Sequence, residues 1–325
     1  MPLRRRFGAP SLVAVPLPII IDTDPGIDDT LALLLALNSP ELEVRGIAIT
    51  YGNTVVENAY RNCVAVLRKV GKRIPLAVSA RRPLKRALAV ALETHGETGL
   101  GRASVPRAGV ILDYVKSLDR LLAEQPEPVT LVTLGPVTGL AHALRRDPDL
   151  VRAKVSRHFA MIGNLNAAGN TTKYSEFNAW CDPDALDLVL RAELPTQMIG
   201  LDVTRELVVT GKEIARLATS ELEQERWLHA ALEFYLEFHR TYEQLDGCVV
   251  NDVLVIAELL RPGTVTFQPT RIAVDLEPGE HRGHTKIDPE GARVDAATDV
   301  RPAAARELLF ERVLTSLAPA GAGSA

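Results

Sequence analysis

The stretch IIIDTDPGIDDTLALLLAL, which runs from Ile19 to Leu37, sets the expectations for the rest of the chain. Its three leading isoleucines are typical of a buried strand, and the run from Leu31 to Leu37 is apolar on nearly every side of a helix. The polar segment between them is therefore predicted to be a strand-to-helix turn, bent sharply by Pro25 and Gly26.

Four carboxylates crowd this turn, namely Asp22, Asp24, Asp28 and Asp29. Like charges about 4 Å apart repel by roughly 4 kcal/mol at an effective dielectric of about 20, whereas a helix N-terminus offsets only about 0.3–1 kcal/mol per acid. A bound cation would remove this repulsion, and oxygen ligands favour Ca²⁺ or Mg²⁺ over Zn²⁺. A structural alternative, in which Asp24 caps the helix and Asp28 and Asp29 favour its first turn, accounts for only some of the acids.

The acids of the first helical turn are expected to point in different directions. One turn separates Asp24 from Asp28, while Asp29 is rotated from its neighbour by about 100°. One member of the adjacent pair can therefore face a metal while the other faces the hydroxyl groups of a ligand.

The segment DTDPGIDD, Asp22 to Asp29, resembles the signature of the inosine-uridine preferring nucleoside hydrolase family, calcium enzymes that cleave N-ribosides. The resemblance continues through several separated motifs, in the family's order, from about Pro18 to Leu317. It implies a single-domain α/β fold, with a mostly parallel, twisted, Rossmann-like sheet flanked by helices. It also implies hydrolysis of the N-glycosidic bond of ribonucleosides to ribose and free nucleobase.

The composition agrees with one globular domain. The chain has 325 residues, of which 46% are hydrophobic and 24% charged, and α/β folds of this size are often single domains. We expect an N-terminal extension at 1–17, a catalytic domain at 18–317 and a flexible tail at 318–325. The net charge of −4 gives no basic footprint for nucleic acid, and no segment reaches the roughly 20 apolar residues of a membrane span. Three cysteines without a CxxC motif are expected to be free, buried thiols in the cytoplasm.

A second strand, turn and helix follow the first. Leu42 to Thr50 is predicted to be a strand and Val55 to Val70 a helix, with Asn53 in the turn between them. The repeated unit favours parallel strands with right-handed crossovers, in which ligands bind beyond the carboxyl ends of the strands. Asn53 on its own could be an ordinary turn residue. The resemblance places an active-site asparagine at this position.

Two further positions gain a role from the resemblance. A lone loop histidine such as His95, in THGETG, is more often structural than catalytic, but the family places an HGE-type segment beside the nucleobase. Leu134 follows the predicted strand Val129 to Thr133, and Ca²⁺ accepts backbone carbonyl oxygens. In the family the aligned carbonyl ligates calcium; the alternative is a Gly-Pro turn and nothing more.

The long loop from Gly163 to Asn178 is predicted to bind a polyol. Its amides and its carboxylate can both donate to and accept from sugar hydroxyls, and structureless loops of this length are usually functional or disordered. The resemblance assigns ribose contacts to Asn170, Glu176, Phe177 and Asn178. Upstream the chain has Ile162-Gly163-Asn164 where relatives commonly have Met-Gly-Gly, which is a departure from the pattern.

Two segments of the C-terminal half offer candidates for base and metal contacts. The region Lys212 to Tyr242 is predicted to be helical, and its aromatic stripe is typical of a core. The family's corresponding region borders the base, which makes Phe238, His239 and Tyr242 candidates. Where the family pattern is His-Asp, this chain has Asn251-Asp252, so that only the aspartate fits.

The remaining segments carry weaker expectations. Asp202 and Arg205 are interpreted as solvated or capping residues. An antiparallel edge is expected at Arg271 to Asp275, followed by a turn that resembles the family's late hairpin, and a closing helix is expected from Arg301 to Leu317.

The resemblance implies a mechanism. Calcium would be held by Asp24, Asp29, the Leu134 carbonyl and Asp252, and would bind the ribose diol and a water molecule. Asp24 would act as the base. The side chains expected to fix the ribose are Asp28, Asn53, Asn170, Glu176, Phe177 and Asn178. His95, His239 and Asn251 would lie near the leaving base.

Two other functions are compatible with parts of the sequence. Aspartate-nucleophile phosphatases also begin with a strand and DxD, but their motif wants Thr or Val where this chain has Gly26. A nucleoside- or ribose-binding protein with little turnover is suggested only by Asn251. The favoured interpretation is a cytoplasmic enzyme of nucleoside salvage or catabolism. It would act on a small ribonucleoside as a homotetramer or, alternatively, a homodimer, and would bind neither nucleic acid nor membrane.

Overall fold

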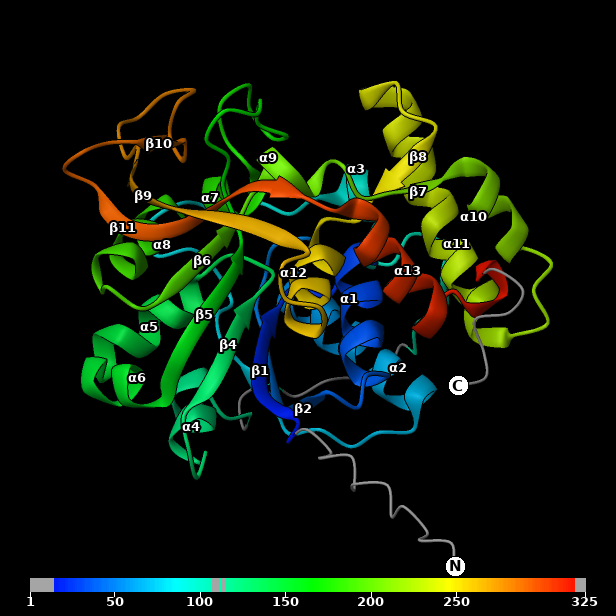
Figure 1. Cartoon of the computed structure of the whole chain (residues 1–325), viewed down its shortest axis with the longest axis horizontal. Coiled ribbons are helices and arrows are strands. Elements are labelled where there is room, and N and C mark those ends of the chain that lie inside the picture. The colour runs from blue at the N-terminus through cyan, green and yellow to red at the C-terminus, as the bar shows by residue number, and fades with distance from the viewer. Residues whose placement is uncertain (1–14, 107–111, 113–114, 319–325) are drawn as a thin grey trace, which may run out of the picture.

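A computed structural model of the chain describes residues 15–106, 112 and 115–318. Within these residues the main sheet has nine strands in the order β10-β9-β11-β6-β5-β4-β1-β2-β3, with helices on both faces (Figure 1). Its parallel strands in chain order are β1 (Leu17–Thr23), β2 (Leu42–Ile49), β3 (Leu76–Val78), β4 (Val129–Thr133), β5 (Val155–Met161) and β6 (Thr196–Ile199). The predicted single α/β domain with a mostly parallel sheet is confirmed.

The remaining strands extend one edge of the sheet or form a small ribbon. Strand β11 (Ala292–Val300) runs parallel to β6 and antiparallel to β9 (Val265–Val274), which pairs with β10 (Thr285–Ile287). Strands β7 (Val208–Thr210) and β8 (Gly247–Val249) form a separate antiparallel pair.

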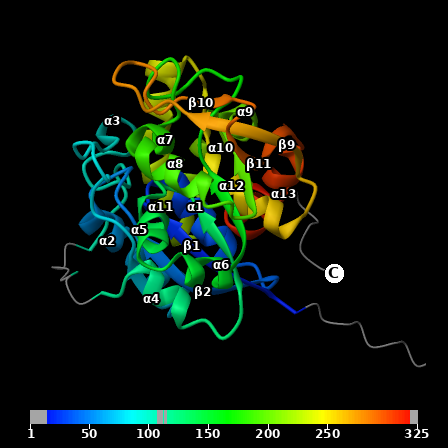
Figure 2. The same ribbon diagram turned by 90° about the vertical axis from the view of Figure 1, so that its left-hand side faces the viewer.

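The helices pack in two layers (Figures 1 and 2). Helices of the first part of the chain are α1 (Ile27–Leu37), α2 (Val56–Val70), α3 (Leu92–His95), α4 (Leu118–Ala123), α5 (Thr138–Arg146), α6 (Pro148–Lys154), α7 (Phe177–Cys181) and α8 (Pro183–Arg191). Those that follow are α9 (Leu201–Thr204), α10 (Gly211–Leu217), α11 (Glu223–Phe238), α12 (Asn251–Leu260) and α13 (Pro302–Arg312), with a π-helix at His239–Glu243 and a 3-10 turn at Thr315–Leu317.

The three isoleucines of β1 explain how the sheet is buried on both faces. Alternate residues of a strand point to opposite faces, so Ile19 and Ile21 lie in the core beneath α1 and α12, while Ile20 lies in the core on the other side, beneath α5. Every residue of α1 is buried, as its all-round apolar pattern predicts. This packing fixes the turn between β1 and α1.

Strand order places that turn at a switch point of the sheet. From β1 the chain builds outward through β2 and β3 on one side, and from β4 through β5 and β6 on the other. The connection that leaves β1 therefore runs toward β2, and the one that leaves β4 runs the opposite way toward β5. Divergence of two neighbouring connections leaves a crevice at the carboxyl ends of β1 and β4. No helix in the described part of the chain is long and apolar enough to cross a membrane.

Several predicted boundaries are wrong. The helix expected at Lys212 to Tyr242 is interrupted between α10 and α11, where the Ser220 hydroxyl accepts from the Leu222 N–H and donates to Glu225, so that side-chain bonds replace helical ones. Leu201 opens a short helix instead of ending β6, and the closing helix stops at Arg312.

The expected N-terminal extension also includes part of the sheet. Leu17 belongs to β1 and pairs with Leu42, so the strand begins one residue inside that extension. The rest of it through residue 14, and residues 319–325 of the expected tail, lie outside the described part of the chain. All three cysteines are free and buried, as expected.

Candidate active site

Asp29, which follows the turn between β1 and α1, is held by hydrogen bonds from backbone and side-chain groups. Gly26 is the N-cap of α1, and its N–H donates to Oδ2 of Asp29 at 3.0 Å. The amide of Asn53 donates to the same oxygen at 2.6 Å, and the Thr23 hydroxyl donates to Oδ1. Asp29 is therefore fixed from two neighbouring loops, and its orientation is set by the ends of β1 and β2.

Asp22 does not share this environment. It lies within β1, where its Oδ1 accepts from the Ser79 hydroxyl at 2.6 Å and its Oδ2 has no hydrogen-bond partner among the described residues. Burial raises the pKa of Asp22 to about 7. The four acids of the turn are thus one strand residue and three site residues.

A fourth site carboxylate comes from the start of α12. Asp28, Asp29 and Asp252 each offer an oxygen within 4.8 Å of the others, and all three are buried. Burial and the charge of Asp29 raise the pKa of Asp28 to about 7 and that of Asp252 well above its usual range. These carboxylates resist ionisation together, and a divalent cation bound among them would offset their mutual repulsion.

Asp24 completes the acid cluster and shows the same need for a charge partner. Its Oδ2 accepts from the Asn53 N–H at 2.6 Å, whereas its Oδ1 is buried without a partner among the described residues. Burial and Asp29 raise its pKa well above the usual range. Unpaired, buried carboxylate oxygens fit a hard divalent cation, because such ions take oxygen ligands.

Two glycines let the Asp24 carboxylate occupy its place. A Cβ on Gly52 would lie 2.0 Å from its Oδ2, and a Cβ on Gly135 would lie 2.3 Å from its Oδ1. Either side chain would overlap the carboxylate, so these glycines are required by close approach. They were not among the residues that the sequence singled out.

The resemblance makes Asp24 the base of the reaction. We therefore expect Gly135→Ala to lower kcat by about tenfold to a hundredfold, because displacing a reacting group by about 1 Å can cost this much. The added methyl group would push the Asp24 carboxylate from its position. Gly211→Ala is the matched control, because its Cβ meets only the ends of the exposed Asp246 and Arg240 side chains. Steady-state kinetics on a ribonucleoside and a thermal melt of both variants check the expectation. Equal losses in both would contradict it.

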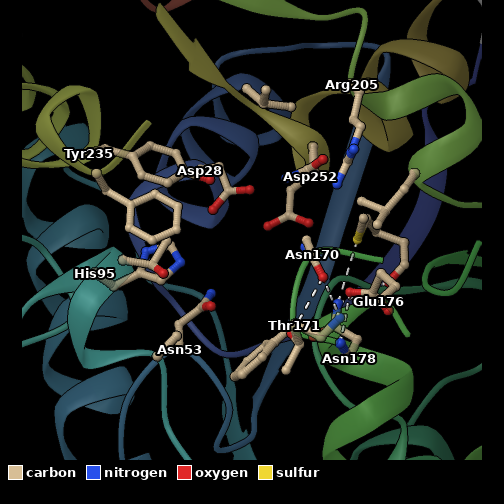
Figure 3. A pocket seen from close by; sticks show the side chains of 18 of the residues that line it. Asp28, Asn53, His95, Asn170, Thr171, Glu176, Asn178, Arg205, Tyr235 and Asp252 are labelled. Atoms are coloured by element: carbon tan, nitrogen blue, oxygen red, sulfur yellow. Dashed lines mark hydrogen bonds between the residues drawn. The ribbon is translucent and has the colours of Figure 1, made fainter. Parts of the chain in front are cut away.

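Asp28 and Asp252 line a pocket that is partly open to solvent (Figure 3). The predicted site residues in its wall are Asp28, Asn53, His95, Leu134, Asn170, Glu176, Phe177, Asn178, His239, Asn251 and Asp252. Asp24 and Asp29 do not line the pocket themselves. Both accept hydrogen bonds from Asn53, which does line it. The exposed Tyr242 does not line the pocket, while Phe238 does.

One side of the pocket is aromatic. His95 and Tyr235 lie 5.4 Å apart between ring centroids, and Tyr235 packs edge-on against His239 at 4.3 Å. The Nδ1 of His95 accepts from the Ile27 N–H at 3.1 Å, so a neutral His95 carries its proton on Nε2. Burial lowers its pKa to about 3, which keeps the ring neutral.

His239 has neither ring nitrogen free. Its Nδ1 donates to the Tyr235 carbonyl at 2.9 Å, and its Nε2 accepts from the Val249 N–H at 3.3 Å. It therefore supports the aromatic wall and offers the pocket no available proton in this arrangement.

On the other side, the 163–178 loop turns several polar groups toward its own backbone. Both oxygens of Glu176 accept from backbone N–H groups, among them that of Gly163 at 2.8 Å. Burial nevertheless raises its pKa to about 7. The Asn178 amide donates to the Leu134 carbonyl at 2.8 Å, which links this loop to the end of β4. A carbonyl oxygen has a second lone pair, so the Leu134 oxygen can still accept another partner.

Asn164 and Asp202 hold the same loop in shape. The buried Asn164 amide donates to the Ala167 and Tyr174 carbonyls at 2.7 and 3.0 Å, which accounts for the departure from Met-Gly-Gly. Asp202 accepts from the N–H groups of residues 165–167 at 2.7–3.0 Å. The interpretation of Asp202 as a solvated or capping residue was therefore wrong.

Asn251 lies between Asp28 and α9. Its Oδ1 accepts from the buried Thr204 hydroxyl at 2.7 Å, and its side chain is hydrogen-bonded to Asp28. Burial and Asp29 raise the pKa of Asp28, and the bond from Asn251 offsets part of that rise. Because the oxygen faces Thr204, the amide donates to Asp28. Asn251 therefore orients an acid of the cluster.

The sequence had named neither Thr204 nor Tyr235 as a site residue. It had treated Arg205 as a solvated or capping residue, which agrees with its exposure and its place as the C-cap of α9, but it had not placed Arg205 at the pocket. All three come from segments whose placement depends on how α9 and α11 pack against α12 and α3. Tyr235 could have been found from its position, since it precedes His239 by one helical turn.

Comparison with known proteins gives concordant results. Residues 19–307 match the family described as inosine-uridine preferring nucleoside hydrolase. The pyrimidine-specific ribonucleoside hydrolase RihA of Citrobacter koseri is 34% identical over 277 residues, 84% of this chain and 88% of that protein. The solved structure of the plant nucleoside hydrolase PpNRh1 superposes with a TM-score of 0.85 at 28% identity, covering 92% of this chain and 99% of that one. The purine-preferring ribonucleoside hydrolase of Gardnerella vaginalis gives 0.83 at 29% identity, covering 91% and 98%.

Proposed function

Because this chain belongs to the inosine-uridine preferring nucleoside hydrolase family, we propose that it works with a calcium ion held by the acid cluster at the β1–α1 turn. The chain is an N-glycosyl hydrolase that converts ribonucleosides to ribose and free base. The observation that supports a metal is the group of three buried carboxylates with oxygens within 4.8 Å of one another. This assignment leaves no role for the phosphatase alternative or for a binding protein without turnover.

The proposed ligands are Asp24, Asp29, Asp252 and the Leu134 carbonyl. Hard oxygen donors without nitrogen or sulfur suit calcium, and the unpaired Oδ1 of Asp24 supplies one such donor. When bound, the ion would make a water molecule easier to deprotonate and would hold the ribose diol. Asp28 is close enough to Asp29 and Asp252 to bind either the ion or the diol.

The chain's own groups would then divide the reaction. Asp24 takes a proton from the attacking water, and the oxygen of that water bonds to C1′ of the ribose. The C1′–N bond breaks, and its electron pair goes to the base. Nearby carboxylates would stabilise the positive charge that develops on the sugar. The side chains proposed to position the ribose are Asp28, Asn53, Asn170, Glu176, Phe177 and Asn178. The base would lie against Tyr235, with His95 and His239 beside it.

A metal-replacement experiment tests the ion. We expect chelation to lower the melting temperature by several degrees and to remove activity, because an ion at 100 times its Kd adds about 2.7 kcal/mol of stability. Calcium should restore both properties and zinc should not. Asp252→Asn should abolish the calcium-dependent shift, whereas Asp149→Asn, at an exposed position on α6, should preserve it. Protein that contains no divalent metal and melts identically with chelator would contradict the site.

The domain bounds, the cellular compartment and the number of subunits are also proposed. We propose that the catalytic domain expected at 18–317, extended by Leu17 of β1, belongs to a cytoplasmic homotetramer, or alternatively a homodimer, used in nucleoside salvage or catabolism. The buried, unpaired cysteines support a reducing compartment. Light scattering on the purified protein would measure the number of subunits. The relatives named above include pyrimidine-specific and purine-preferring enzymes, so uridine and inosine should both be assayed.

A further inference from the structure

The turn between β9 and β10, residues 275–284, contacts the segment that carries the proposed ribose-binding residues. Figures 1 and 2 show this turn, in orange, beside α7. A Cβ on Gly283 would lie 2.8 Å from the Cα of Trp180, so the turn packs directly on the backbone of α7. The N-cap of α7 is Glu176, which lines the pocket.

Thr285, the first residue of β10, fixes the beginning of the 163–178 loop. It is fully buried, and its hydroxyl makes two hydrogen bonds to one residue of the loop. The hydroxyl donates to the Asn164 carbonyl at 2.6 Å and accepts from the Asn164 N–H at 2.9 Å. A single side chain therefore satisfies both backbone polar groups of Asn164.

The turn also contacts the other end of the loop. The Ser175 hydroxyl donates to the Arg282 carbonyl at 3.2 Å, and Tyr174 stacks on His281 with ring centroids 3.7 Å apart. The turn is itself anchored, because the Arg282 guanidinium pairs with the buried carboxylate of Asp184 on α8. Both ends of the loop are thus held from outside the pocket.

Gly163 connects Thr285 to the pocket. Its φ is +74°, which lies in the left-handed region, and a Cβ there would lie 2.8 Å from the Thr285 hydroxyl oxygen. The Gly163 N–H donates to Oε2 of Glu176 at 2.8 Å. Because Asn164 follows Gly163 directly, a shift of the Asn164 backbone would change the direction of this N–H.

The Glu176 carboxylate is oriented by backbone N–H groups and keeps capacity for a ligand. Its Oε2 accepts from Gly163 and Ala179, and its Oε1 accepts from Asn178 at 2.7 Å. An ionised carboxylate has about four lone-pair sites, so Oε1 can accept one further hydrogen bond. The direction of that remaining site is set by the same N–H groups.

We propose that the β9–β10 turn positions the ribose-binding loop, with Thr285 as the positioning residue that acts on Glu176 through Asn164 and Gly163. The proposal rests on the nucleoside hydrolase function and on the ribose contact proposed for Glu176. Thr285 is not part of the pocket wall formed by the described residues, so it acts on a ribonucleoside through the loop.

The experiment is a double-mutant cycle between Thr285 and Glu176. It measures kcat/KM for uridine and inosine by base release from calcium-loaded enzyme. Thr285→Val keeps the shape of the side chain but removes both hydrogen bonds to Asn164. It should lower kcat/KM by about tenfold to a hundredfold, because misplacing a positioning group by about 1 Å can cost as much. In a Glu176→Gln background the same change should lower kcat/KM by less than about twofold, since its effect depends on Glu176.

Two further variants separate positioning from a general structural defect. Thr285→Ser keeps the hydroxyl and should retain the wild-type kcat/KM. Thr264→Val is the matched control, because Thr264 is also buried and its hydroxyl donates to the Arg261 carbonyl at 2.7 Å, outside the loop. It should lower the melting temperature without lowering kcat/KM. Equal losses from Thr285→Val in both backgrounds would overturn the proposal, as would an unchanged kcat/KM in the folded variant.

Ser175→Ala gives a milder test, which decides the matter if Thr285→Val does not fold. It removes only the bond to the Arg282 carbonyl and should lower kcat/KM by roughly threefold to tenfold, the range for one hydrogen bond. This loss should disappear in the Glu176→Gln background; no loss, or the same loss in both backgrounds, would contradict the role of the turn. If wild-type enzyme cleaves neither uridine nor inosine, the nucleoside hydrolase activity itself fails and the proposal falls with it.

Discussion

Asp24→Asn is expected to lower kcat by about 10²- to 10⁴-fold while leaving the fold intact, because general-base catalysis is worth that much. Asparagine has nearly the same shape, and its side-chain oxygen can still accept from the Asn53 N–H, as Oδ2 of Asp24 does at 2.6 Å. What the amide cannot do is take a proton or contribute negative charge at the position of the unpaired Oδ1.

Asp22→Asn is the matched control for this variant. Asp22 and Asp24 are both buried, and each has one hydrogen-bonded and one unpaired oxygen, but Asp22 faces Ser79 within the sheet. We expect Asp22→Asn to keep kcat within about threefold, since removing a charge outside the reaction gives no loss of general-base catalysis. Melting temperatures of both variants measure any structural damage. If Asp24→Asn kept its kcat while Asp28→Asn lost it, Asp28 would be the base.

The fold was predictable where local pattern and burial agree. The β1–α1 stretch carries its strand, turn and helix signals within the residues Ile19 to Leu37, and both ends are buried. Strand β9 was predicted only from residue 271 onward, because its first six residues combine the buried Val265 with exposed and half-buried positions in no regular alternation and include Pro269. Its pairing with β11 comes from tertiary contacts that no local pattern records.

The sequence predicted most of the residues that gather at the pocket, but it did not predict their hydrogen bonds. Loops at the carboxyl ends of parallel strands converge, so Asn53, Leu134 and Glu176 reach one pocket. Which group each side chain contacts depends on packing between distant segments. Glu176 accepts hydrogen bonds from backbone N–H groups. Arg205 reaches the pocket wall because α9, which it follows, packs against β11 and α12.

A second large effect is expected on kcat/KM, which should depend strongly on how easily the base can leave. A purine leaves poorly as an anion, and none of the three candidate donors holds a readily transferable proton. Asn251 is hydrogen-bonded to Thr204 and Asp28, and an amide has no proton to give at neutral pH. Both nitrogens of His239 are occupied. His95 is neutral, so its Nε2–H can donate a hydrogen bond without carrying an extra proton.

We therefore expect p-nitrophenyl riboside, whose leaving group needs no acid, to be cleaved with a kcat/KM at least about 10²-fold above that for inosine. His95→Ala should lower kcat/KM for inosine and not for the activated riboside, because only inosine uses a hydrogen bond to its base. Asn251→His should narrow the gap between the two substrates if the new ring reaches the base, and should lose the contact with Asp28. Efficient inosine cleavage that survives the combined loss of His95 and His239 would show that neither histidine replaces the family's histidine, whose position is taken here by Asn251, in assisting departure of the base. Equal kcat/KM values for both substrates in the wild type would show that departure of the base does not limit the reaction.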